Sequence, residues 1–322
     1  MTRRTELRAL WAVVIPAGLL IALYALMSAA PAQASSIFLS DRAAPPGQPA
    51  TDVITLDVPI LMYHHVGANF RSRYNISVRD FDAQMAYLAQ HGYTTVSIDQ
   101  IAAALRGQGG LPPCPVALTF DDGYADVHTN ALPILKHDGL HATFYIVAGF
   151  ISTTNRFMNW NQVKDLAAQG MFIGSHSYTH PFLAQLAGPR LPHQIVDSKT
   201  RLEQELGIPI TTFAYPFGSF SLTAMRAVSE AGYTAAVWTG YGARQTSNLI
   251  YKLSRFGMYD GLSLPMFAVR LPRHSPDGAG ACPLYGEVPS VPLEPPHRRP
   301  TPPPARTFPD SPNRFRAVVT SS

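Results

Sequence analysis

The sequence predicts an α/β fold, an irregular barrel of parallel strands joined by helices. From residue 58 to residue 238, short apolar runs alternate with segments of about ten residues that carry apolar side chains at helical spacing. Such alternation is typical of repeated strand–helix–strand units with a parallel sheet. The chain has no Gly-x-Gly-x-x-Gly fingerprint, which favours a barrel over a dinucleotide-binding sheet.

The predicted strands are short apolar runs that cover residues 58–63, 94–98, 116–120, 142–147, 172–175, 211–215 and 234–238. The first predicted helix carries Phe81, Met85 and Leu88 on one face, with Asp80 as its expected N-cap. Further helices are expected over residues 99–107, 131–137, 160–169, 198–206 and 222–231. A glycine at or just after the end of these segments is a common helix stop.

The N-terminus indicates export. Arg3, Arg4 and Arg8 precede or flank an apolar run over residues 9–27, and Ala32-Gln33-Ala34 offers a cleavage site of small residues. The run also approaches the roughly 20 residues that span a bilayer. Residues 1–34 are therefore expected to be a signal peptide or a signal anchor, and the protein to be secreted or anchored on the outer face of the cytoplasmic membrane.

Composition divides the rest of the chain into a linker, a globular domain and a tail. Residues 35–57 are predicted to be a linker, residues 58–270 the globular domain, and the Pro-rich residues 271–322 a disordered tail. A net charge of +4 without massed Lys and Arg gives no reason to expect nucleic acid as a partner. Because Cys282 falls in the tail, its pairing with Cys114 is not expected.

The segment Leu118-Thr-Phe-Asp-Asp-Gly123 places two adjacent carboxylates, Asp121 and Asp122, at the C-terminal end of a predicted strand. Barrels place their reactive groups at that end. Neighbouring side chains there point in different directions, so one carboxylate can face a metal while the other faces the substrate. The alternative is an ordinary Asp-Gly turn after a strand.

Two histidines four residues apart, His176 and His180, follow another predicted strand. Imidazole is a favoured ligand of zinc and its neighbours. With Asp122 the pair makes a set of two nitrogens and one oxygen, and three protein ligands leave a position for water, as in catalytic sites. A chance pairing is the alternative in a chain with 11 histidines.

The segment Phe213-Ala-Tyr-Pro-Phe-Gly218 combines a rigid proline with a permissive glycine. This pairing would present the Phe217 amide to a cleft, where it would suit a developing oxyanion. An ordinary strand-to-helix turn is the alternative.

Together these segments resemble the polysaccharide deacetylase family, the NodB-homology carbohydrate esterases, over about residues 59–266. Thr119–Gly123 and His176–His180 match its signatures, and the opening Ile60–Gly67 resembles the branch of exported poly-N-acetylglucosamine deacetylases. The resemblance implies an irregular (β/α) barrel and hydrolysis of N-acetyl groups on a polysaccharide of N-acetylglucosamine type.

The resemblance also implies residue roles. Asp121 would be the general base, and Asp122, His176 and His180 would bind a divalent metal, with Zn²⁺ expected. The Phe217 amide would stabilise the oxyanion. Two positions depart from the family pattern: Ala214 replaces an arginine that supports the base, and Arg255 replaces the histidine that acts as acid.

These departures lead to further hypotheses. His65 is the hypothesised general acid, with a structural histidine as the alternative, and Arg255 is hypothesised to replace the missing arginine beside Asp121. Trp238 and Tyr178 are candidates for stacking on sugars.

Three kinds of protein are alternatives to a deacetylase: a catalytically inactive glycan-binding relative, an amidase acting on a small amide, and a phosphate-ester hydrolase built on the two aspartates. The sequence does not distinguish chitin-like, peptidoglycan and poly-N-acetylglucosamine substrates.

Overall fold

The computed structural model describes residues 52–67, 72–272 and 282. Contacts within the chain separate the residues up to Asp52 from a unit that begins at Val53, and nearly all described residues belong to this unit. The predicted signal segment, most of the predicted linker and most of the predicted tail lie outside the described residues. Within the described ranges, no helix is long and apolar enough to cross a membrane.

The main sheet is parallel and runs in the order β10-β9-β8-β7-β6-β2-β12. A parallel bridge between Val237 and Leu253 joins the edge strand β10 to the segment that leads into β12, so the sheet curls back on itself. This confirms the predicted α/β barrel class. The strands are β2 Ile60–Tyr63, β6 Pro115–Phe120, β7 Thr143–Ile146, β8 Phe172–Ser175, β9 Thr212–Ala214, β10 Ala235–Val237 and β12 Phe256–Gly257, with β5 Thr94–Thr95 pairing the start of β6.

Two short pairs of strands lie outside this sheet. β1 (Thr55–Asp57) pairs antiparallel with β11 (Arg244–Thr246), and β3 (His65–Val66) pairs with β4 (Asn75–Ile76). β1 falls within the segment expected to be linker. Its backbone partners are far along the chain, so local composition does not reveal them.

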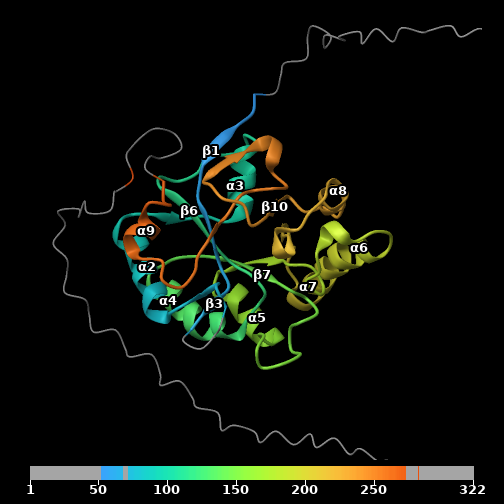
Figure 1. Ribbon diagram of the computed structural model, residues 1–322, viewed down its shortest axis with the longest axis horizontal. Coiled ribbons are helices and arrows are strands. Elements are labelled where there is room, and N and C mark those ends of the chain that lie inside the picture. The colour runs from blue at the N-terminus through green and yellow to red at the C-terminus, as the bar shows by residue number, and fades with distance from the viewer. Residues whose placement is uncertain (1–51, 68–71, 273–281, 283–322) are drawn as a thin grey trace, which may run out of the picture. The chain divides into compact units, whose positions relative to one another are not determined.

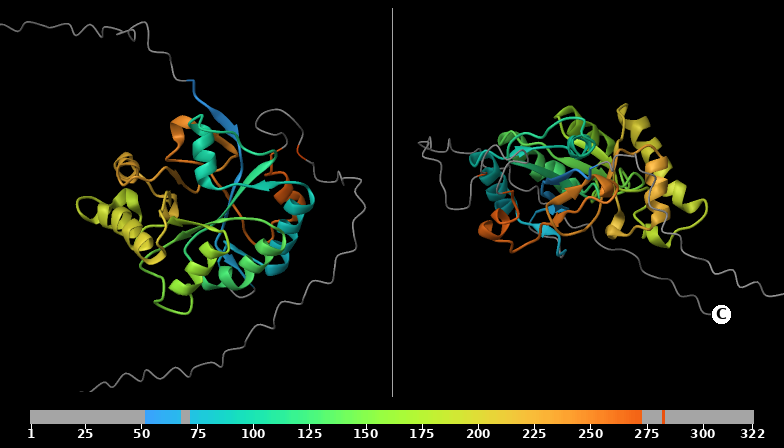
Figure 2. Two further views of the ribbon diagram at one scale, coloured as in Figure 1. Left: turned by 180° about the vertical axis from the view of Figure 1, so that it is seen from behind. Right: turned by 90° about the horizontal axis from the view of Figure 1, so that it is seen from above.

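Helices surround the curled sheet (Figure 1), and the two views of Figure 2 place α2 and α7 on opposite sides of it. Their apolar faces pack on the outward side chains of the strands in one large core. The helices are α2 Val78–Gln90, α3 Ile98–Leu105, α4 Leu132–His137, α5 Trp160–Ala168, α6 Arg190–Pro192, α7 Ser198–Leu206, α8 Leu222–Glu230 and α9 Leu264–Ala268, and a turn of π-helix, Val127–Ala131, leads into α4.

Two helices begin earlier than the sequence predicts, because serine hydroxyls cap them. The Ser77 hydroxyl accepts the Asp80 amide at 3.0 Å, so the N-cap of α2 is Ser77 and not Asp80. Ser97 caps α3 and forms a capping box with Gln100. This cap ends the extended segment, so the predicted strand over residues 94–98 shortens to Thr94–Thr95.

The alternation of side chains along β6 aims the first acidic residue into the barrel. Leu118 and Phe120 pack outward against the helices, whereas Ala117 belongs to a second, inner cluster. Thr119 also faces inward, where Arg255 donates to its hydroxyl at 3.2 Å. Because the period of a strand is two, Asp121 continues this inward row just beyond the end of β6.

Helix α3 covers the opposite end of the barrel. Its apolar residues, Ile98, Ile101, Ala102 and Leu105, join the inner cluster. The Asp99 carboxylate accepts hydrogen bonds of 2.7 Å from Thr211 and from Thr234, which directly precede β9 and β10. The amino ends of these strands are therefore tied to the start of α3.

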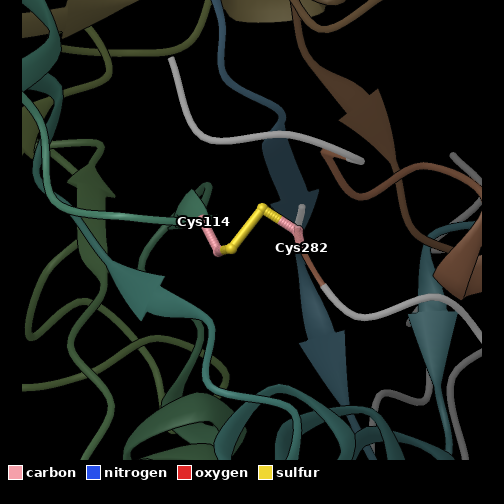
Figure 3. The surroundings of a disulfide bond; sticks show 2 residues. All are labelled: Cys114 and Cys282. Atoms are coloured by element: carbon pink, nitrogen blue, oxygen red, sulfur yellow. A yellow bond between two sulfur atoms is a disulfide. The ribbon is translucent and has the colours of Figure 1, made fainter. Parts of the chain in front are cut away.

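Cys114 and Cys282 form a disulfide, so the expectation that they do not pair is wrong. Their Cα atoms lie 5.5 Å apart across 168 residues of sequence. Figure 3 shows the two side chains meeting between the residue that precedes β6 and the C-terminal segment. The expectation failed because composition describes the segment around Cys282 but not where folding brings it.

Candidate metal centre

Three predicted ligand residues converge at the carboxyl ends of β6 and β8. The Asp122 Oδ1 atom lies 3.2 Å from His180 Nε2 and 3.4 Å from His176 Nε2, and the two imidazole nitrogens lie 3.2 Å apart. Ligands of a tetrahedral zinc ion, about 2.0–2.2 Å from the metal, lie about 3.3–3.6 Å from one another. The spacing of these three atoms fits one divalent ion.

The local backbone of this site is unusual. Asp122, His180 and Phe217 have φ values of 75°, 60° and 56°. Residues other than glycine rarely adopt the left-handed region, and such strain persists where the surrounding structure imposes it, often at functional sites. Because these residues surround one cavity, the fold holds them in conformations that local sequence does not favour.

Hydrogen bonds orient two of the ligand residues. His176 Nδ1 donates to the carbonyl of Ala214 at 2.8 Å, which leaves its Nε2 lone pair directed at Asp122. The Ser177 hydroxyl accepts the His180 amide at 2.9 Å. Asp122 Oδ1 is buried and receives no hydrogen bond from the described residues. A buried carboxylate oxygen facing two imidazole nitrogens is the donor set of a metal site.

Asp121 lies beside this set and is held by Arg255. The guanidinium donates two parallel hydrogen bonds of 2.7 Å, one to each carboxylate oxygen, and both side chains are almost completely buried. Arg255 also donates to the carbonyl of Trp238 at 3.1 Å and lies over the Tyr145 ring. The arginine hypothesised for this position is therefore in contact with Asp121.

The surrounding charges decide the ionisation of both carboxylates. Burial would raise the pKa of Asp121, but the charge and hydrogen bonds of Arg255 outweigh it and lower the pKa. Burial likewise opposes ionisation of Asp122, and the adjacent imidazoles of His176 and His180 hold its pKa well below the usual value. Both groups are therefore carboxylates at neutral pH, as a base and a ligand must be.

A cavity of about 410 Å³ opens over these residues. Its lining includes the three candidate metal ligands, two adjacent histidines and several aromatic rings. The lining residues are Met62, His64, His65, Ser72, Tyr74, Asp121, Asp122, Tyr124, Phe150, His176, His180, Phe217 and Thr239. Phe217, the predicted amide donor, lines it through a turn that follows β9, and its ring packs on His180 at 4.4 Å.

The structure places His65 and its neighbour His64 differently. His65 Nδ1 lies 3.1 Å from Asp126 Oδ2, and its ring stacks on Tyr124. The His64 ring is close enough to Asp121 and Asp122 for their charges to act on it, although burial lowers its pKa overall. Its Nδ1 has no hydrogen-bond partner among the described residues.

Sequence reasoning missed His64. Its position directly after the last residue of β2 was a usable signal, because strand ends carry the site. The acid role predicted for His65 stays a prediction, and His64 joins it as a candidate.

The two predicted stacking residues, Trp238 and Tyr178, do not line the cavity. The Trp238 indole packs edge-on against Phe220, and its N–H lies 3.4 Å from the Ser254 hydroxyl. The Tyr178 ring packs on His193. Sugar contacts by these rings stay predictions, and the cavity gives them no support.

The curled α/β barrel carries at its carboxyl edge a cluster of three side chains whose donor atoms could hold one metal ion. Residues 108–236 match the family described as polysaccharide deacetylase. The chain is 29% identical over 206 residues to YxkH of Bacillus subtilis, a protein that is named as a polysaccharide deacetylase. The matched residues make up 64% of this chain and 73% of the relative. The chain therefore contains a region, residues 108–236, that matches a polysaccharide deacetylase domain.

The chain is also similar to one further relative in sequence and to one solved structure in fold. The chain is 30% identical over 151 residues to the poly-β-1,6-N-acetyl-D-glucosamine N-deacetylase of Escherichia coli K12, a match over 41% of this chain and 22% of that relative. Its fold is similar to that of the Streptococcus pyogenes deacetylase PplD, with a TM-score of 0.64 and 24% identity over 68% of this chain and 99% of the other.

Proposed function

We propose that the protein is a metal-dependent hydrolase that removes N-acetyl groups from a polysaccharide of N-acetylglucosamine type. The observation that carries the proposal is the convergence of Asp122, His176 and His180 beside the Arg255-bound Asp121. The match of residues 108–236 to the polysaccharide deacetylase family supports the reaction class. The match to the E. coli relative supports the sugar, although it spans only 22% of that protein.

Asp122, His176 and His180 would hold the metal, and Zn²⁺ suits a set of two imidazole nitrogens and one carboxylate. When bound, such an ion supplies Lewis acidity and makes water more nucleophilic. His176 is fixed for this role by its hydrogen bond to the Ala214 carbonyl, which sets the tautomer that leaves Nε2 free to bind.

Asp121 would act as the general base. Its lowered pKa keeps it ionised, and the two hydrogen bonds from Arg255 hold its plane in one orientation. In this role Asp121 removes a proton from the water that attacks the acetyl carbonyl. The Phe217 amide would donate to the oxyanion that forms on the carbonyl oxygen.

A general acid must then protonate the departing amine, and the cavity offers two histidines. The charges of Asp121 and Asp122 act on His64, whereas His65 lies 3.1 Å from Asp126. We favour His64 because both carboxylates of the cavity act on its ring. Parallel His64→Gln and His65→Gln variants test this choice: the true acid shows the larger fall in kcat at unchanged metal content, and equal small losses would reject both.

We further propose that the protein acts outside the cytoplasm, either secreted or anchored at the membrane through residues 1–34. The motivation is the Arg-flanked apolar run described above. Fractionation of producing cells, with N-terminal sequencing of the recovered protein, tests both the location and the cleavage.

Acetate release from N-acetylglucosamine oligomers tests the function directly. We expect release by the metal-loaded protein, its abolition by chelator and its recovery with Zn²⁺. Tight oligomer binding without acetate release, at full metal occupancy, would instead support a catalytically inactive glycan-binding protein. Chitin-type, peptidoglycan and β-1,6-linked polymers compared in one assay would identify the polymer.

A further inference from the structure

A stack of three side chains runs from His64 to the edge of the cavity. The imidazole packs against the Tyr74 ring with centroids 4.6 Å apart and an angle of 18° between the planes. The Arg73 guanidinium lies over the same tyrosine ring, 5.1 Å from its centroid. His64 and Tyr74 line the cavity, and Arg73 is exposed. Arg73 does not itself line the cavity, but it lies over a tyrosine that does, and this position beside the lining is called the rim.

A second stack of the same kind begins at the next residue. The His65 ring packs on Tyr124 at 3.6 Å and 20°, and the Arg156 guanidinium lies 5.1 Å from the centroid of the tyrosine. Arg156 also approaches the Tyr124 hydroxyl at 3.4 Å. His65 and Tyr124 line the same cavity, and Arg156 is exposed. Each of the two adjacent histidines therefore packs on a tyrosine ring, and an arginine lies over each tyrosine ring.

Neither arginine at the rim forms an ion pair with a carboxylate of the described residues. Other basic side chains of this domain do, including Lys199 with Glu203 and Arg201 with Glu205. An aromatic face holds a guanidinium in place without neutralising it. Arg73 and Arg156 therefore keep their full charge and most of their N–H donors available to a ligand.

Neither carboxylate of the cavity pairs with these two arginines. Asp121 is paired with Arg255, and the Asp122 carboxylate faces two imidazoles. Among the described residues, no other acidic side chain lines the cavity. A negatively charged group that entered beside the reacting sugar would therefore meet two guanidinium groups and no unpaired carboxylate at the rim.

We infer that Arg73 and Arg156 form an anion-binding rim, which selects acetylated glycans that carry a carboxylate or a phosphodiester near the reacting sugar. The inference rests on the proposed function and names the substrate class of the same site. Guanidinium groups bind both kinds of anion through paired hydrogen bonds.

The rim also acts on the product. Deacetylation converts a neutral amide into an amine that is protonated at neutral pH. The two arginines repel this cation, so a deacetylated segment binds more weakly than the acetylated segment it came from. The rim therefore favours fresh substrate and assists release of product.

The test compares three acetylated oligomers of equal length: N-acetylglucosamine alone, N-acetylglucosamine alternating with glucuronic acid, and N-acetylglucosamine linked through 1-phosphate. For each, kcat/KM of acetate release is measured with the wild type, R73Q, R156Q, the double variant and R226Q. Arg226 is an exposed arginine of α8 that takes part in neither stack, and it serves as the control. Binding of the same oligomers to metal-free protein is measured by calorimetry at low and high salt.

In the wild type we expect kcat/KM to be higher for the anionic oligomers than for the neutral oligomer. In R73Q/R156Q we expect this ratio to fall about tenfold and no more, because each exposed ion pair contributes little binding free energy. The preference is expected to shrink at high salt and to persist in R226Q. The better anionic oligomer identifies the source of the charge. Equal ratios in wild type and double variant would overturn the inference.

The binding measurement separates the two proposals. Preferential binding of an anionic oligomer that is lost in R73Q/R156Q supports the rim even if no oligomer releases acetate, in which case the deacetylase proposal fails alone. Acetate release from neutral and anionic oligomers alike, with equal binding of both, supports the deacetylase and rejects the rim.

Discussion

The two ends of the barrel are built on opposite principles. At the carboxyl end, Asp122, His180 and Phe217 adopt left-handed backbone conformations, and the buried Asp122 Oδ1 has no hydrogen-bond donor in the described part of the chain. At the amino end, Asp99 satisfies two threonine hydroxyls, and a disulfide begins at Cys114. One end stores strain around reactive groups and the other supplies bonds that resist unfolding, as is general in barrels of this kind.

Substitution of a candidate metal ligand should have the largest effect, and it should lower the catalytic rate without lowering the stability of the metal-free protein. In Asp122→Asn we expect kcat/KM for acetate release to fall by roughly a thousandfold or more, because a bound metal supplies several kcal/mol of transition-state stabilisation. Metal content by mass spectrometry should fall in parallel. Thermal unfolding of the metal-free proteins should show the variant to be no less stable than the wild type. Wild-type metal content with wild-type activity would remove Asp122 from the site.

Substitution of Arg255 tests whether catalysis and stability depend on different residues, because Arg255 is buried inside the barrel and also holds the proposed base Asp121. Arg255→Gln leaves Asp121 buried without its partner, so we expect a loss of stability of about 3–5 kcal/mol together with a large fall in kcat. Loss of the nearby positive charge raises the pKa of Asp121. The base is then protonated at higher pH, and the acid limb of the kcat/KM profile moves to higher pH.

Arg255→Lys is the matched control, since it restores the charge without the paired hydrogen bonds. It should recover the position of the acid limb better than it recovers kcat. An unchanged pH profile in Arg255→Gln would show that Arg255 acts on stability alone.

The disulfide should matter to stability and not to chemistry. In the double variant Cys114→Ser/Cys282→Ser we expect the free energy of unfolding to fall by about 2–5 kcal/mol, because the bond closes a long loop in the unfolded chain. Reduction of the wild type should lower the melting temperature similarly. Acetate release at temperatures below unfolding should be unchanged. A comparable fall in kcat at full folding would show that the two ends are coupled.

Asp99→Ala should have the smallest effect. The variant loses two hydrogen bonds to a carboxylate at the amino end, and we expect a loss of about 1–3 kcal/mol in chemical denaturation. The kinetic constants should not change. Asp99→Asn, which keeps an acceptor, should lie between the two proteins, and a variant as stable as the wild type would show that the threonines are satisfied without Asp99.

The sequence alone was sufficient to predict the repeating strand–helix architecture and to predict which residues lie together at the site. Apolar runs and glycine stops identified most strands and helices of the barrel, because burial on both faces of a parallel strand leaves a local pattern. Asp121, Asp122, His176 and His180 stood out because each follows such a strand, and parallel strands bring their carboxyl ends to one edge. The N-caps Ser77 and Ser97 were misjudged because several polar residues near a helix start compete for the cap.

Only the tertiary structure decided which distant residues meet. Arg255 reaches Asp121 across 134 residues, and Cys114 reaches Cys282 across 168. The stack of His65, Tyr124 and Arg156 likewise joins segments that no local signal connects. Local sequence encodes the period and the ends of the elements. Side-chain contacts between elements depend on how the sheet curls, and the closure between Val237 and Leu253 sets that curl.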